Sequence, residues 1–253
     1  MSPMVDSLLV LASVFGSGML GLSLRSFVPA HYLEEDSVAM VRLCTGVIAT
    51  LAALVLGLLV ASAKANYDRV NDQVTQAAAS IVLLDRTLAQ FGPQTTEARG
   101  LLRTVVAAVV DTVFSKHSRG VADLDDPQRL ALGDRLQADI RVLPADTEVQ
   151  RTLKSQALEL SNEVAKMRLL TITQAQGSLP AMFLVVLVLW LVIMFAGFGL
   201  VTARNRMVMV TLFLCALSLA GAVFMIEELN QPLEGLMQVS SAPMRYALSH
   251  IGG

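Results

Sequence analysis

Four long apolar runs alternate with polar segments along this chain, and they form two pairs. The runs extend over Val5 to Leu24, Leu43 to Ala63, Pro180 to Thr202 and Met207 to Ile226. Each has about 20 residues or slightly more, and at about 1.5 Å per helical residue that length crosses a hydrocarbon core of about 30 Å. The pattern predicts an all-α, polytopic membrane protein with four transmembrane helices arranged as two hairpins.

Residues 64–178, between the hairpins, show a helical periodicity. Apolar residues recur at steps of four and three from Val70 to Phe91, and Gly92 and Pro93 then suit a helix end. We therefore expect an antiparallel pair of long helices, a stalk continuous with the second and third membrane helices, with two shorter helices packed against it. The predicted seams are Val70, Val74, Ala77, Ile81, Leu84, Leu88 and Phe91, then Val149, Leu153, Gln156, Leu160, Val164, Met167 and Thr171. The shorter helices are expected to bury Leu101, Val105, Val106, Val109 and Val113, then Leu132, Leu136 and Ile140, the second following a loop from Gly120 to Pro127.

These patterns predict four domains. Residues 1–63 form the first transmembrane hairpin, residues 64–178 a helical extramembrane domain, and residues 179–228 the second hairpin. Residues 229–253 form an interfacial amphipathic tail, because Pro232 and Gly235 interrupt a largely apolar segment. The tail is expected to lie along the membrane surface or against the base of the stalk.

Composition agrees with a membrane protein, since 54% of the residues are hydrophobic and 16% are charged. The net charge of -2 and the absence of a polybasic block argue against nucleic acid as a partner. The first apolar run lacks a preceding basic region and contains Asp6, which favours a retained helix over a cleaved signal peptide. A multi-pass protein of the cell (inner) membrane, in contact with the lipid bilayer, is the expected setting.

Charge near the predicted spans leaves the orientation open. The short connections contain Arg25, Arg42, Arg204 and Arg206, and the opposite ends of the spans are near Lys64, Arg69, Lys166, Arg168 and Arg245. These numbers are nearly equal, so the positive-inside rule does not place residues 64–178 on one side.

No catalytic or metal-binding pattern stands out in the sequence. His31, His117 and His250 are far apart, and there is no HExxH, glycine-rich phosphate loop or GxSxG motif. The sequence therefore predicts a protein that is not an enzyme, with no catalytic residue, cofactor or metal site.

Small residues recur every four positions on the second predicted span and mark its candidate site. Such a pattern lets a second helix approach closely, either within one subunit or from a neighbouring subunit, or lines a conduit. Hydroxyl and glycine residues nearby offer space and weak polar contacts to an ion. The candidate pore-lining or helix-packing residues are Thr45, Gly46, Ala49, Thr50, Ala53, Gly57 and Ala61. The first span has Ser13, Ser17 and Gly21 at the same spacing.

Five charged residues are candidates for ion pairing or gating. Asp85 and Arg86 are adjacent on an otherwise apolar-faced helix and are expected to form a local or interhelical pair. Glu227 and Glu228 end the fourth span, where a carboxylate needs water or a partner. Arg245 would reach one of them if the tail folds back.

Three long stretches resemble one known family. They are RLCTGVIATLAALVLGLLVASAKANYD (residues 42–68), IVLLDRTLAQFGPQTTEARGLLR (residues 81–103) and ALSLAGAVFMIEELNQPLEGLMQVSSAPMRYAL (residues 216–248). Together they resemble the bestrophin-like bacterial membrane family catalogued as domain of unknown function 4239. The resemblance implies similarity to bestrophins, which are homopentameric anion channels with four membrane helices per subunit. No stretch matches the bestrophin pore neck or calcium clasp, so no channel residue is carried over by position.

Three classes of function are considered. The leading hypothesis is a homo-oligomeric, bestrophin-like ion channel or pore that passes small inorganic ions passively, as the anion-conducting bestrophins do. The alternative is a membrane-anchored helical scaffold or sensor with no transport activity. A carrier is third, because no charged residue marks a mid-membrane site and no inverted repeat is evident.

Overall fold

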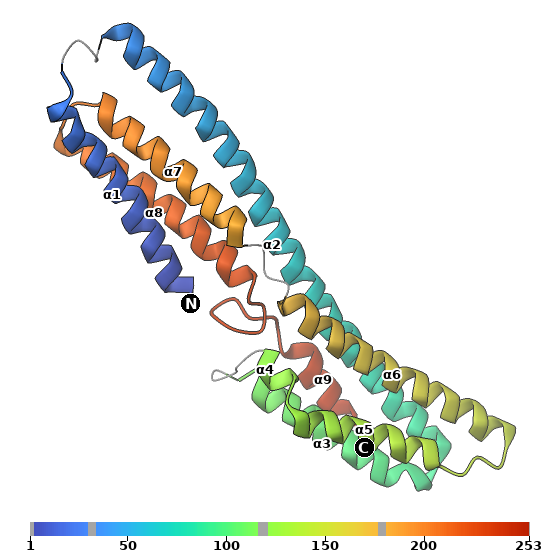
Figure 1. Ribbon diagram of the computed structural model, residues 1–253. Helices are drawn as coiled ribbons and strands as arrows, with labels where there is room; N and C mark the ends of the chain where they lie inside the picture. The colour runs from blue at the N-terminus through green and yellow to red at the C-terminus, as the bar shows by residue number, and fades with distance from the viewer. Residues whose placement is uncertain (1–2, 30–33, 116–120, 177–180, 253) are drawn as a thin grey trace. The chain divides into compact units, whose positions relative to one another are not determined.

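The computed structural model describes residues 3–29, 34–115, 121–176 and 181–252. Within these residues the regular elements are helices, so the fold is all-α, as predicted. The chain divides into two compact units. One contains Met1–Ala65 and Ser178–Asn230, and the other contains Asn66–Gly177 and Gln231–Gly253. The long helix α2, Glu35–Phe91, contributes residues to both units (Figure 1).

The first unit contains the four predicted spans. Four helices are long and apolar enough to cross a membrane, and each coincides with one of the four apolar runs. In this unit α1 packs against α7 and α8 (Figure 1). Pro180, the predicted first residue of the third span, lies outside the described residues. The elements are α1 (Pro3–Leu24), the 3-10 turn η1 (Arg25–Phe27), the first part of α2, α7 (Ala181–Val201) and α8 (Arg206–Leu229).

Glycines allow α1 and α7 to approach closely. A Cβ atom at Gly21 of α1 would lie 3.0 Å from the backbone nitrogen of Leu200 and closer still to the carbonyl oxygen of Ala196. A Cβ atom at Gly199 of α7 would lie 2.8 Å from the backbone nitrogen of Leu22. Such backbone-to-backbone approach is how helices associate without a hydrophobic driving force. The Gly21 end of the small-residue groove of α1 is therefore filled within the subunit, by α7, whereas Ser13 is exposed.

The second unit is a helical domain with its own apolar core. All seven residues of the first predicted seam, from Val70 to Phe91, are buried. Gly120, the predicted start of the loop before α5, lies outside the described residues. Besides the second part of α2, the elements are η3 (Pro93–Thr95), α3 (Thr96–Val113), α4 (Val121–Leu124), α5 (Pro127–Val142), α6 (Glu148–Gln176) and α9 (Ala242–His250).

The buried face of α6 differs from the predicted seam. Val149 is 68% exposed and Gln156 is exposed, whereas Ala157 and Ser161 are buried. The face is displaced by one position in the middle of the helix, where the small residues Ala157 and Ser161 are buried, whereas Met167 and Thr171 of the predicted seam are buried as predicted. The spacing of large apolar residues along the helix therefore does not reveal this part of the contact surface.

Polar side chains join α2 and α6 within the second unit. The Ser80 hydroxyl donates to Glu163 Oε2 at 2.9 Å, and Gln73 Nε2 donates to Gln174 Oε1 at 2.8 Å. The Thr171 hydroxyl also donates to Gln73 Oε1, at 3.0 Å. Residue numbers rise along α2 as they fall along α6 between these pairs, so the two helices are antiparallel.

The C-terminal segment belongs to the core of the second unit. Leu233, Val239, Met244 and Ala247 are buried in the same cluster as the α2 seam. Arg103 Nη1 also donates to the carbonyl oxygen of Ile251 at 3.2 Å. The apolar residues of this segment complete the core of the helical domain, which agrees with packing against the stalk, one of the two placements expected for the tail.

A glycine-based turn ends α2. Gly92 has a φ of 124° and a ψ of -174°, a backbone conformation that is essentially restricted to glycine. The buried Thr95 hydroxyl is 2.6 Å from the carbonyl oxygen of Leu88 and 2.8 Å from that of Gly92. The chain can therefore reverse directly into α3 while the Thr95 hydroxyl serves as a hydrogen-bond donor at the end of α2.

We expect Gly92→Ala to destabilise the protein by about 1 to 3 kcal/mol, because a Cβ atom is strained in that conformation. Gly100→Ala is the matched control, since Gly100 lies within α3 and a Cβ atom there would meet nothing within 4 Å. The control should be neutral or slightly stabilising. Thermal unfolding of both variants in detergent checks the difference, and an equal midpoint for the two would contradict the role of the turn.

Candidate functional site

The membrane part of α2 has three faces of different character. Its buried residues, Thr45, Ala52, Leu59 and Ala63, are spaced by seven, seven and four positions and face the subunit's own helices. The Thr45 hydroxyl donates to the Val41 carbonyl at 2.7 Å. A Cβ atom at Gly197 of α7 would lie 3.1 Å from the Thr45 oxygen, so this residue packs within the subunit.

The second face of α2 contains the other candidate residues and is open in the single chain. Ala49 is half-buried at its edge. Side chains added at Gly46 or Gly57 would meet no atom within 4 Å. At about 100° per residue, the exposed members fall within about 80° of the helix circumference. The exposed members are Gly46, Thr50, Ala53, Gly57 and Ala61, which we call the small-residue face.

The third face of α2 carries large apolar side chains that are also exposed. It lies next to the small-residue face and contains Met40, Leu43, Val47, Leu51, Leu54 and Leu58. Only 17% of the apolar window of α2 is buried, against 28 to 33% for the other three candidate spans. Within the described residues, α2 is thus the span least covered by its own subunit.

Among the charged candidates, Asp85 forms an interhelical ion pair. Asp85 pairs with Arg99 of α3 and not with the adjacent Arg86, which is exposed. Adjacent residues on a helix point in different directions, which is why the local pair does not form. The Asp85 carboxylate accepts two hydrogen bonds, from Arg99 Nε at 2.9 Å and Arg99 Nη2 at 3.0 Å. The hydrogen bonds to Asp85 raise the pKa of Arg99, against the opposing effect of burial.

The remaining acidic candidates lie at the end of α8. Glu227 is half-buried. Glu228 is buried and has an interaction partner. Arg245 is exposed on α9, in the second unit. Its pairing with either glutamate stays a prediction.

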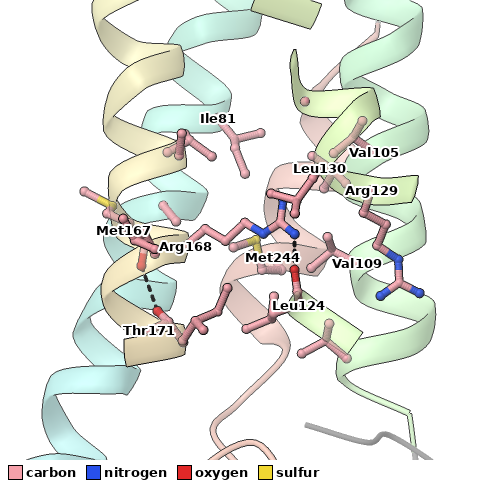
Figure 2. A pocket seen from close by; sticks show the side chains of 18 of the residues that line it. Ile81, Val105, Val109, Leu124, Arg129, Leu130, Met167, Arg168, Thr171 and Met244 are labelled. Carbon is pink, nitrogen blue, oxygen red and sulfur yellow. Dashed lines mark hydrogen bonds between the residues drawn. The ribbon is translucent and has the colours of Figure 1, made fainter. Parts of the chain in front are cut away.

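A cavity of about 250 Å³ lies in the second unit and was not anticipated from the sequence. Side chains from α2, α3, α5, α6 and α9 line it, among them Ile81, Val105, Leu130 and Met244. Figure 2 shows Arg168 of α6 extending between these residues, with its guanidinium at the backbone of Leu124. One clue was present in the sequence: Arg168 falls between Val164 and Thr171, both on the predicted seam of its helix.

Val105 and Val109 show why the cavity forms. Both were expected in the core of α3, and both are only half-buried because they line the cavity. The closely packed positions of the helix are Ala98, Leu102, Val106, Val110 and Val113. The apolar face of α3 is therefore wider than the surface that its neighbours cover.

Comparison with known proteins identifies the family of this chain. The model of the bestrophin-like domain matches residues 10–244. A crystal structure of a bacterial bestrophin homolog from Klebsiella pneumoniae, carrying a point mutation, has the same fold, with a TM-score of 0.65 and 14% identity over 97% of each chain. No curated protein matches the sequence. Because the domain match covers most of the chain and both membrane hairpins, the chain belongs to the bestrophin-like family.

Proposed function

We propose that this chain is one subunit of a homo-oligomeric, passive ion channel or pore that spans the inner cell membrane several times. Membership of the bestrophin-like family supports a channel-like protein rather than an enzyme. The observation that carries the proposal is the small-residue face of α2, which the subunit's own helices leave open.

Different surroundings suit the different faces of α2. Lipid tails suit the adjacent stripe of large apolar side chains, from Met40 to Leu58. Lipid gains little from the shallow surface around Gly57, whereas the backbone of a neighbouring helix or a water-filled conduit fits it. The Thr50 hydroxyl donates to the Gly46 carbonyl at 3.0 Å, and rotation of this side chain would let it offer a passing ion a weak contact instead.

In this arrangement copies of the chain surround an axial path, with α2 as its wall. The small-residue face would border the path or the neighbouring subunit, and Thr45 and Ala49 would hold α2 against its own bundle. Small inorganic ions, anions by analogy with the bestrophins, would move down their gradient with no chemical step.

Reconstitution into liposomes tests the proposal. The purified protein should pass small monovalent ions above the level of empty vesicles, and Gly57→Leu should reduce that flux at least tenfold by filling the small-residue face. Gly221→Leu is the matched control, because Gly221 lies on α8 and a Cβ atom there would also meet nothing within 4 Å. The control should conduct like the wild type.

Three outcomes would count against the proposal. Flux equal to that of empty vesicles at all tested potentials would reject a channel. Equal loss in both glycine variants would remove the assignment of the wall to α2. A monomer without an axial opening, seen by imaging the purified protein, would favour the membrane-anchored scaffold or sensor.

A further inference from the structure

The cavity in the helical domain is largely apolar, and two arginines, Arg129 and Arg168, are among its lining residues. Ile81, Val109, Leu130, Met167 and Met244 surround its interior, and they come from five different helices. Figure 2 shows Ile81, Val109, Leu130 and Met244 around the space that Arg168 enters from α6. A concave apolar pocket with few convergent polar groups is the usual form of a small-molecule site.

Arg168 is incompletely satisfied by the protein. Its Nη2 donates to the carbonyl oxygen of Leu124, the last residue of α4, and a guanidinium has five N–H donors. Among the described residues, no carboxylate oxygen lies within 4 Å of the Arg168 guanidinium, so Arg168 forms no ion pair with them. Burial lowers the pKa of Arg168, and the raising effect of Asp125 does not offset it. A partly desolvated cation in this state favours a bound anion.

The acidic residues around the cavity limit the charge of that anion. Asp125 and Asp134 are exposed, so water screens them, and the buried Asp123 already has a partner. Arg129 also lines the cavity, but its guanidinium donates to the carbonyl oxygen of Asp123 and points away from Arg168 in Figure 2. One negative charge on the ligand therefore matches the single positive charge of Arg168.

The volume limits the size of the apolar part. A cavity of about 150 Å³ holds benzene, which corresponds to roughly 25 Å³ for each non-hydrogen atom. On that scale the 250 Å³ here accommodates about ten such atoms. Octanoate, with eight carbon and two oxygen atoms, has this size and a single charge.

We propose that the helical domain binds a medium-chain monocarboxylate, with its acyl chain in the apolar chamber and its carboxylate on the Arg168 guanidinium. The carboxylate would accept the N–H groups that the Leu124 carbonyl does not use, in the bidentate geometry that guanidinium and carboxylate share. This site goes beyond the proposed channel activity, because binding here does not depend on whether the chain conducts ions.

Calorimetric titration of the full chain in lipid nanodiscs with octanoate tests the site, with empty nanodiscs subtracted for partitioning into lipid. We expect one octanoate per chain. Arg168→Met should weaken binding about tenfold or more, as the loss of charge-assisted hydrogen bonds implies. Arg86→Met, which removes an exposed arginine of the same domain, should leave binding unchanged. Val109→Trp fills the chamber with Arg168 intact and should also abolish binding.

The choice of ligands separates the contribution of the negative charge from that of the acyl chain. Acetate lacks the acyl part, octanol and octylammonium lack the negative charge, and hexadecanoate exceeds the volume, so each should bind at least tenfold more weakly than octanoate. The site would be rejected if octanol matched octanoate, or if both Arg168→Met and Val109→Trp bound like the wild type. Thermal midpoints of the variants are measured in parallel, so that loss of binding is compared only between folded proteins.

Discussion

Replacing Arg99 with alanine is expected to lower the free energy of unfolding by about 3 to 5 kcal/mol, because it strands a buried carboxylate. The Asp85 side chain is 4% exposed and that of Arg99 is 20% exposed, so water compensates poorly for a lost partner. Two hydrogen bonds, at 2.9 and 3.0 Å, are lost together with the charge pair. The pair connects α2 to α3 on the two sides of the Gly92 turn.

Thermal unfolding in detergent measures this loss, which corresponds to a fall of roughly 6 to 20 °C in the midpoint for a chain of this size. The double variant Asp85→Leu with Arg99→Met is the control. It removes both charges and retains apolar volume, so it should be much more stable than Arg99→Ala alone. Arg86→Ala should change the midpoint little, since that side chain is exposed. If Arg86→Ala were as damaging as Arg99→Ala, the assigned pair would be wrong.

Replacing Gly21 with alanine should cost about 2 to 3 kcal/mol, at the upper end of the range for overpacking. The added methyl group would meet the backbone of Ala196 and Leu200 rather than the end of a flexible side chain. The helices α1 and α7 would have to move apart, and contacts along their whole interface would weaken. Gly199→Ala should cost a similar amount of stability, because its Cβ atom would meet the backbone of Gly18 and Leu22.

Gly16→Ala is the matched control for this second prediction. Gly16 belongs to the same helix, and a Cβ atom there would meet nothing within 4 Å. Alanine favours the helical state by up to about 1 kcal/mol over glycine, so this variant should be as stable as the wild type or more so. The thermal midpoint in detergent distinguishes the three variants. Equal stability of Gly21→Ala and Gly16→Ala would contradict the close approach.

The sequence pattern predicted only part of each candidate site. Sequence reasoning identified the small residues of α2 but not which of them the subunit covers, since Thr45 packs against Gly197 while Gly57 stays open. It also missed the role of Arg168, because a single arginine on a stalk helix is normally solvated. Only the position of the Leu124 carbonyl and of the residues from four other helices places this cation in a cavity.

The sequence by itself determined the four apolar spans, the all-α class and the buried seam of α2 from Val70 to Phe91. These features follow from the length and the periodicity of apolar runs. Both are properties of a single helix, so they can be recognised within one segment of the sequence. Tertiary structure alone decided that Asp85 pairs with Arg99, that α1 packs against α7 through glycine, and which of its two expected placements the C-terminal segment adopts. Each of these contacts joins segments that are separate along the chain, so its partner depends on how the helices pack and not on the spacing within either one.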